Sequence, residues 1–189
     1  MNFRTTLFMI GLLAGVAALV YFGGKAPDPK DLGKDQKKLI EKSIGDRVTW
    51  IEIARGAEKI VLEKDDKGGW ALTAPSRCAA ADSAISPITA EIDSMERQQT
   101  YAPGDPKYDL KAMGLDAPTG VLTVKAGDVT HVFRIGKRTS TQKECFVQLD
   151  DDKKIYVVAD SIMTKVVEKP IADFRDKALF QDFDTFAVD

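Results

Sequence analysis

The 189-residue chain has 27 Lys and Arg against 29 Asp and Glu, a net charge of −2, with one His and two Cys. Its basic residues are spread evenly, so the sequence lacks the basic patch that is typical of a nucleic-acid-binding surface. One His and two widely separated Cys leave zinc and haem sites without their usual ligands. We therefore expect no nucleic acid, metal or organic cofactor.

The first element is an uncharged, mostly apolar run at residues 5–24, between Arg4 and Lys25. This length is about what an α-helix needs to cross a bilayer. A cleaved signal peptide is the alternative, but its apolar region usually spans only about 7–15 residues. We therefore predict an uncleaved transmembrane signal anchor over residues 1–24. The Lys and Arg residues on its two sides do not decide its orientation.

Small residues recur inside this predicted helix. Gly11 and Gly15 are four positions apart, and Ala14 and Ala18 repeat the spacing. Such a pattern lets a second helix approach closely in lipid. We predict that these four residues pack on a transmembrane helix of a partner complex. Because small residues are also common in ordinary transmembrane helices, a simple tether is the alternative.

A solvated linker is expected at residues 25–44, which contain Pro, Gly and many charges, and a folded domain at residues 45–180. Alternating apolar and polar residues then predict three strands joined by polar turns, an antiparallel meander, at residues 48–53, 58–63 and 70–73.

The first of these strands has two different faces. Thr49, Ile51 and Ile53 share one face by the period-two pattern, and Trp50 and Glu52 share the other. An aromatic residue that points away from the core is the kind of side chain that protein interfaces use. Trp50 is therefore a candidate contact for a partner protein.

A helix is predicted after the meander. Ser86 suits an N-cap and Pro87 suits the first helical position. A start at Asp82 would instead place Pro87 inside the helix and kink it. The apolar stripe of this helix, at positions i, i+4 and i+7, is Ile88, Ile92 and Met95.

Four further strands are expected at residues 120–124, 129–135, 145–149 and 155–158. A short helix then begins with Asp160 as its cap and ends before Pro170. The full order after the transmembrane helix is β-β-β-α-β-β-β-β-α. That order predicts an α+β fold with an antiparallel sheet.

The candidate reactive groups have simpler structural explanations. The three aspartates at residues 150–152 lack the alternate spacing of a calcium loop and predict a solvated turn. His131 shares a strand face with Val129 and Phe133, which indicates a half-buried packing residue. The sequence has no nucleophile elbow and no phosphate-binding loop. We therefore do not expect an enzyme.

The two cysteines, Cys78 and Cys145, allow two interpretations. In an exported domain they could form a disulfide, because the compartment is oxidising. Alternatively, they are unpaired thiols that behave as small apolar side chains. The sequence does not choose between these.

Three segments resemble the bacterial domain of unknown function 4340 family: VTWIEIARGAEKIVLEKDDKGGWALTAP, YDLKAMGLDAP, and the run from VFRIGKRTS to FRDKAL. The resemblance covers residues 45–180. It implies an N-terminally anchored envelope protein without an assigned activity, often encoded near ABC-type export or gliding-type transporter components. It also implies a single-pass protein of the inner membrane with its domain in the periplasm. Residues 181–189 read as the lead-in to a further strand, either a tail that docks back or the start of a missing repeat.

Two classes of function follow. The first is a non-enzymatic, membrane-anchored extracytoplasmic interaction module, an accessory subunit of a larger membrane protein complex. The alternative is a domain that binds a small ligand or an envelope polymer for an ABC-type transporter. A well-formed pocket would favour the second class, and a flat apolar patch the first.

Overall fold

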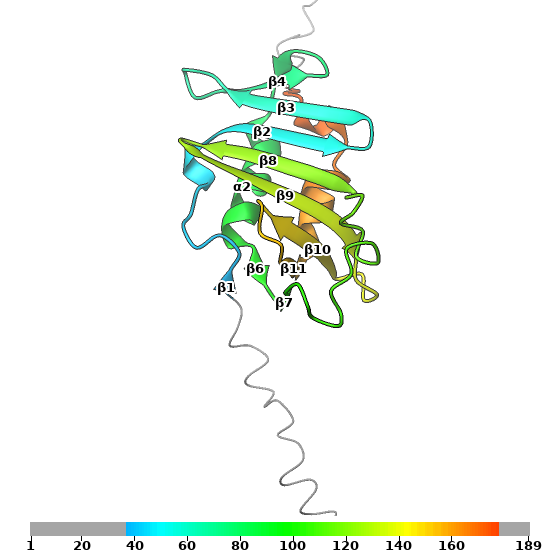
Figure 1. Cartoon of the computed structure of the whole chain (residues 1–189). Helices are drawn as coiled ribbons and strands as arrows, with labels where there is room; N and C mark the ends of the chain where they lie inside the picture. Colours follow the sequence, from blue (N-terminus) through cyan, green and yellow to red (C-terminus); the bar gives the residue numbers. More distant parts are fainter. Residues whose placement is uncertain (1–36, 178–189) are drawn as a thin grey trace, which may run out of the picture. The chain divides into compact units, whose positions relative to one another are not determined.

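The computed structural model describes residues 37–177, within a compact unit that begins at Lys37. This part of the chain is mostly antiparallel β-sheet with few helices (Figure 1). The predicted anchor, with Gly11, Ala14, Gly15 and Ala18, lies outside the described residues, as does the tail at 181–189. Between Lys37 and Lys177 no helix is long and apolar enough to span a bilayer.

The described residues form a nine-stranded sheet in the order β5-β4-β3-β2-β8-β9-β10-β11-β7, with every neighbouring pair antiparallel. The seven predicted strands are present as β2 to β4 and β8 to β11. The strands are β2 (Val48–Arg55), β3 (Glu58–Lys64), β4 (Trp70–Ala74), β5 (Cys78–Ala79), β7 (Gln99–Tyr101), β8 (Gly120–Ala126), β9 (Val129–Arg138), β10 (Glu144–Leu149) and β11 (Ile155–Ala159).

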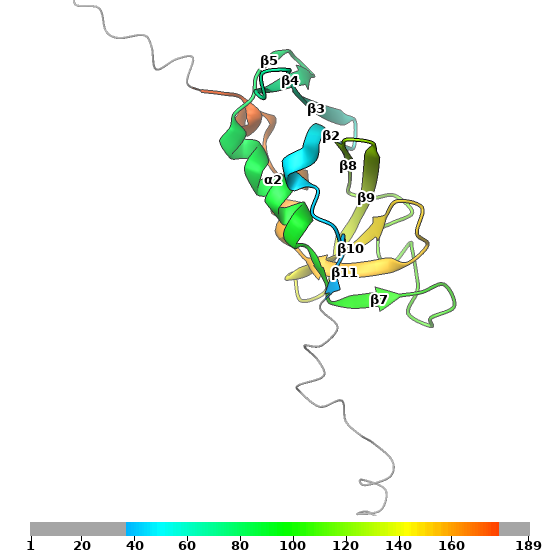
Figure 2. The same cartoon turned by 90° about the vertical axis from the view of Figure 1, so that its left-hand side faces the viewer.

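The inner face of this sheet forms the main apolar cluster with α2 (Asp82–Ser94). Figure 2 shows α2 lying along one side of the strands. Alternate strand residues point to this side because the side-chain period of a strand is two. Ile51, Leu122 and Phe133 lie here and are completely buried.

A bulge corrects the predicted face of β2. Val48 pairs with Ala126 and Trp50 with Lys125, so the register shifts between these two pairs. The extra residue turns Thr49 outward, whereas Val48 is buried. The prediction that Thr49 shares the face of Ile51 was therefore wrong.

The start of α2 also differs from the prediction. The helix begins at Asp82, not at Ser86, and Pro87 lies inside it. Ala84 and Ile85 are buried with the predicted stripe, so burial of an additional turn favours the longer helix. Pro87 cannot donate to the carbonyl of Ser83, and that turn therefore lacks one helical hydrogen bond.

The domain begins earlier than Gly45. β1 (Lys37–Lys38) pairs with β6 (Glu96–Arg97), and the amide of Leu39 donates to the carbonyl of Met95 at 2.8 Å. Ile40 and Ile44 are buried in the main cluster. Residues 37–44 are thus part of the domain, and the boundary predicted for the linker was wrong.

A carboxylate on α2 holds this entry segment in place. Asp93 accepts hydrogen bonds from the Ser43 hydroxyl at 2.6 Å and from the amides of Ile44 at 2.8 Å and Gly45 at 3.0 Å. Partial burial opposes ionisation, but these hydrogen bonds hold the pKa of Asp93 below its ordinary value. The 3-10 helix η1 (Gly45–Arg47) follows and leads into β2.

The outer face of the sheet is covered at one end by residues 102–118. Met113 and Leu115 pack on Ile155, with Phe146 beside them, in a second, smaller apolar cluster. Gly136 in β9 allows this close approach, because a Cβ there would overlap the carbonyl oxygen of Met113. The segment resembling the family, GLDAP, therefore has a packing role here.

Candidate functional site

Charged side chains from three separate elements converge on η2 (Met163–Val167), a π-helix that follows β11. A helix was predicted here. It is present as a π-helix, which is wider than an α-helix. Met163, Val166 and Val167 turn inward and are buried. Single π-helical turns are frequent at functional sites, and charged groups hold η2 in place.

The first of these groups is Glu91 of α2, the single buried charged side chain among the described residues, 6% exposed. The Ser161 hydroxyl and the Lys165 ammonium both bind its carboxylate, the latter at 2.5 Å. Removing the Lys165 ammonium or the Ser161 hydroxyl would leave the buried Glu91 carboxylate with one partner fewer, which would destabilise the fold. Glu91 thus fixes η2 to α2.

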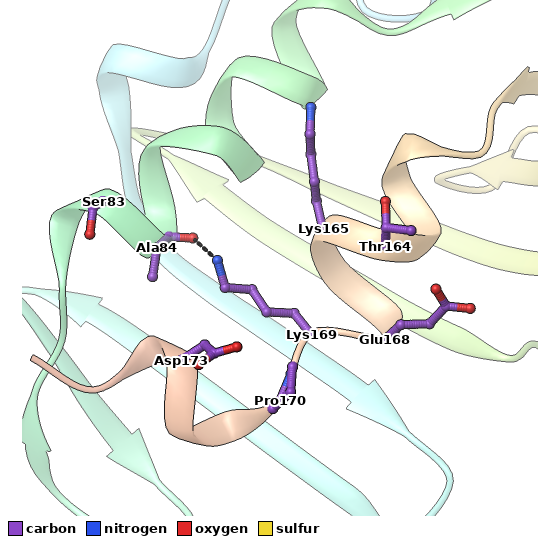
Figure 3. A pocket seen from close by; sticks show the side chains of 8 residues that line it. All are labelled: Ser83, Ala84, Thr164, Lys165, Glu168, Lys169, Pro170 and Asp173. Atoms are coloured by element: carbon purple, nitrogen blue, oxygen red, sulfur yellow. Dashed lines mark hydrogen bonds between the residues drawn. The ribbon is translucent and has the colours of Figure 1, made fainter.

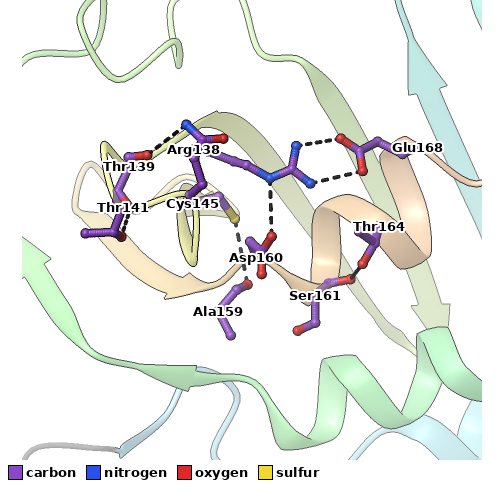
Figure 4. Close-up of polar contacts among 10 residues, drawn as sticks. Arg138, Thr139, Thr141, Cys145, Ala159, Asp160, Ser161, Thr164 and Glu168 are labelled. Carbon is purple, nitrogen blue, oxygen red and sulfur yellow. Dashed lines mark hydrogen bonds and ion pairs between the residues drawn. The ribbon is translucent and has the colours of Figure 1, made fainter.

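Arg138 of β9 binds a residue before η2 and a residue after it (Figure 4). Its guanidinium donates to Glu168 through two nitrogens, at 2.6 and 3.0 Å, and to Asp160 at 3.3 Å. The bond from Arg138 outweighs partial burial and lowers the pKa of the Glu168 carboxyl. The Asp160 carboxylate is therefore engaged by Arg138, and the Asp160 carbonyl accepts from the amide of Met163 at 2.8 Å at the start of the helix.

Arg55 is the third charged group that holds η2. This half-buried guanidinium at the end of β2 donates to the carbonyls of Val167 at 2.5 Å and Lys169 at 2.6 Å, and pairs with Glu58. Carbonyls at a helix C-terminus lack partners inside the helix, and a cation there satisfies them. Charged groups of β2, β9 and α2 therefore fix η2 in place.

A hollow of about 560 Å³ lies between η2, η3 (Ile171–Phe174) and the first turn of α2. Figure 3 shows Lys169 crossing it toward α2. The Lys169 ammonium donates to the Ala84 carbonyl at 3.1 Å and lies 5.3 Å from the centre of the Phe174 ring. The lining residues are Ser83, Ala84, Thr164, Lys165, Glu168, Lys169, Pro170 and Asp173.

Trp50, the predicted protein contact, does lie on the outer face, opposite Ile51 and Ile53. It is half-buried, and the Lys125 ammonium sits 4.3 Å from the centre of its ring. Such cation–π contacts hold an aromatic side chain in one orientation. The ring is thus pre-oriented on a strand.

Cys78 and Cys145 are both free thiols in the structure. They lie in β5 and β10, with five strands between them in the sheet order. Neighbouring strands are about 4.8 Å apart, whereas a disulfide needs Cα atoms within about 7 Å. Burial, together with the nearby Asp160, raises the pKa of Cys145 to about 12, so this thiol is a poor nucleophile.

His131 is half-buried, as predicted, and its Nδ1 lies 2.8 Å from the Asp150 carboxylate. Asp150 begins the predicted turn between β10 and β11. Within residues 37–177, no three His, Cys, Asp or Glu side chains are arranged as metal ligands would be.

The groups around η2 were not predicted from the sequence. Glu91 lies on the same stripe as Ala84, Ile88 and Met95, at helical spacings of three and four, and this position was a usable signal of burial. Arg55 reaches the carbonyls of Val167 and Lys169 more than 100 residues away, and Arg138 reaches Glu168, 30 residues away. Local sequence carries no signal for such pairs.

The fold and the paired charges define an antiparallel, β-rich α+β domain with a polar clamp around a π-helix. A family model described as "Domain of unknown function (DUF4340)" matches residues 70–189. The chain belongs to this family, and the resemblance inferred from the sequence is confirmed. The match begins at β4, so β2 and β3 precede it. No curated protein and no solved structure matches the chain.

Proposed function

We propose that this chain is a single-pass inner-membrane protein whose β-rich domain lies in the periplasm and acts as a non-enzymatic interaction module. Its partner is a subunit of a larger membrane protein complex. The apolar run at residues 5–24 supports the membrane span. The Gly11–Gly15 spacing supports helix packing within the membrane.

The observation that carries this proposal is the unequal cover of the outer sheet face. At one end residues 102–118 cover β10 and β11 with apolar side chains. At the other end, no described segment covers the outer side of β2, β3 and β8, which faces the viewer in Figure 1. Val121, Thr123 and Ala54 remain half-exposed there, beside Trp50. We call this surface, defined by those four residues, the open face.

The open face is better suited to binding a protein partner than to catalysing a reaction. The strands that carry it, β2 and β8, each pair with a neighbour on both sides, so it offers side chains on a rigid platform. Trp50 is held by Lys125, and Glu52 pairs with Lys59 at 2.8 Å. Pre-oriented aromatic side chains lose little conformational freedom on binding and often dominate interface energies.

The test is affinity purification of the tagged full-length protein from membranes in a mild detergent. We expect co-purifying membrane subunits, which Gly11→Leu with Gly15→Leu should remove while the protein stays in the membrane fraction. Ala17→Leu is the matched control, because it makes the same small-to-large change on another side of the helix. Trp50→Ala should weaken the complex separately. Retention of the same subunits by all these variants would refute the packing seam and the open face.

A reporter joined after Asp189 tests the topology. The proposal expects the reporter to be active when it folds in the periplasm. A reporter that is active only in the cytoplasm would show that the domain lies on the other side of the membrane.

A second candidate function is favoured by a different observation. The hollow beside η2 has a volume of about 560 Å³, inside the range of about 300–1,000 Å³ that small-molecule sites have. A domain that binds a small ligand or an envelope polymer for an ABC-type transporter would use this hollow. Under that alternative, loss of the membrane partner would leave ligand binding unchanged.

A further inference from the structure

The hollow between η2, η3 and the first turn of α2 is lined by charged side chains, and the domain holds two of them in fixed positions. Lys165 is fixed by the buried Glu91 at 2.5 Å, and Glu168 by Arg138 through two hydrogen bonds. Even so, the side chain of Lys165 is 40% exposed and that of Glu168 is 46% exposed. A surface Lys or Glu usually moves freely, whereas these two are pre-organised.

The other wall is formed by Lys169 and Asp173. Lys169 is tied to the Ala84 carbonyl at 3.1 Å, where Pro87 has already removed one hydrogen bond of the same turn. An ammonium has three donors, so Lys169 keeps capacity for a further acceptor. Asp173 is 49% exposed, and its contact within the described residues is Lys177 at 3.5 Å. Pro170 and Ala84 supply an apolar floor between these groups.

Both signs of charge therefore line one hollow: two ammonium groups and two carboxylates. Lys165 and Glu168 are compensated by Glu91 and Arg138. Lys169 and Asp173 are therefore the charges that a ligand would meet, and a ligand with a single charge could satisfy only one of them. A zwitterion satisfies both signs, with its carboxylate at Lys169 and its ammonium group at Asp173. Charge-assisted hydrogen bonds of this kind are the stronger ones in proteins.

We propose that this hollow binds the zwitterionic ends of a short peptide, with Lys169 and Asp173 as the recognition residues. Figure 3 shows these two side chains close together beside Pro170. Lys165 and Glu168 form the opposite wall and fit polar groups of the peptide backbone. The site does not depend on the membrane complex proposed above. It deepens the ligand-binding alternative by naming the class of ligand.

The experiment is a calorimetric titration of the full-length protein in detergent micelles with trialanine as the probe. N-acetylated trialanine and trialanine amide each lack one terminal charge. We expect trialanine to bind, and each blocked peptide to bind at least about tenfold more weakly, since each loses one charge-assisted hydrogen bond. Absence of trialanine binding, or equal binding of the three peptides, would overturn the proposal.

Variants of the protein locate the site. Lys169→Gln and Asp173→Asn should each weaken trialanine binding about tenfold, because each removes one recognition charge. Lys59→Gln and Asp66→Asn are matched controls on β3 and the turn that follows it, and should bind as the unmodified protein does. Equal weakening by the controls would contradict the site.

A further variant does not remove any charge. Ser83 is exposed at the rim of the hollow, so Ser83→Tyr should fill the entrance while the core stays intact. Its thermal unfolding should match that of the unmodified protein, and its trialanine binding should be lost. Full binding by a folded Ser83→Tyr variant would place the peptide elsewhere. If affinity purification recovers no membrane subunit while trialanine still binds, the complex alone is refuted. The two proposals therefore fail separately.

Discussion

The two faces of the sheet carry apolar clusters that are built in different ways. The main cluster lies between the sheet and α2, and regular strands and a helix contribute its side chains. The small cluster lies under residues 102–118, which form no long helix or strand, and it depends on a glycine in β9 for close approach. Regular strands and a helix therefore stabilise the main cluster, whereas the small cluster depends on the close approach of the backbone at Met113 to Gly136.

The largest expected effect compares the same substitution in the two clusters. Phe133→Ala removes a completely buried ring from the main cluster and should lower the free energy of unfolding by about 3–5 kcal/mol. Phe146→Ala removes a half-buried ring from the small cluster and should cost about half as much, since part of its surface is already in water. Urea unfolding of both variants gives the comparison. Equal losses would mean that the clusters are energetically alike.

The next largest effect concerns the fit of residues 102–118. Gly136→Ala places a methyl group on the carbonyl oxygen of Met113 and should cost about 1–3 kcal/mol by overpacking. We expect limited proteolysis to cut within residues 102–118 while the rest stays resistant. Gly120→Ala is the matched control, because its methyl group meets the side chain of Val167 on the inner face. Cleavage of both variants at the same sites would show that the small cluster is not a separate unit.

The reactivity of Cys145 tests whether the clusters open independently. Its thiol is buried in the main cluster and its pKa is raised to about 12, so at pH 8 the reactive thiolate is scarce. Iodoacetamide at pH 8 should label Cys78, which is half-buried, and leave Cys145 unlabelled.

The same labelling applied to Gly136→Ala then separates the two clusters. We expect Cys145 to remain protected even when residues 102–118 are cleaved, because β10 is still covered on its inner face. Labelling of Cys145 at the rate seen in denaturant would mean that loosening residues 102–118 also opens the main cluster.

The smallest effect belongs to the entry segment. The pKa of Asp93 is lowered in the folded state, so its stabilising contribution is present above the ordinary value of 3.8 and is lost as pH falls through the lowered pKa. Hydrogen exchange at the amides of Ile44 and Gly45 should therefore speed up below about pH 4 relative to other buried amides. Asp93→Asn should remove this acid dependence. An unchanged dependence in Asp93→Asn would assign it to another carboxylate.

The main cluster could be predicted from the sequence because its elements have strong periods. Most of β2, from Trp50 onward, and the first part of β9 alternate between apolar and polar residues, and polar turns separate the strands. The prediction of α2 began late because Pro87 was given more weight than the burial of Ala84 and Ile85. The two-residue strands β1 and β5 are too short to show any period.

The small cluster and the clamp around η2 could not be predicted in the same way. The GLDAP segment was visible as part of the family resemblance, but its docking on Gly136 is a contact across 20 or more residues. The clamp also depends on distant pairs, such as Arg138 with Glu168 and Arg55 with the carbonyl of Val167. Only the folded sheet brings these groups together, because no local pattern specifies a partner in another element.

The two ends of the described domain lie at opposite edges of the sheet. Lys37 enters beside β6 near one edge, and residues 174–176 leave beside β5 at the other, with the amide of Asp176 donating to the carbonyl of Ala79 at 2.9 Å. A pull on the chain before Lys37 would act first on the two-residue pairing of β1 with β6. The next resistance is Asp93, which holds Ser43, Ile44 and Gly45 at once. The same pull would therefore have to break the hydrogen bonds of Asp93 before it strained β2.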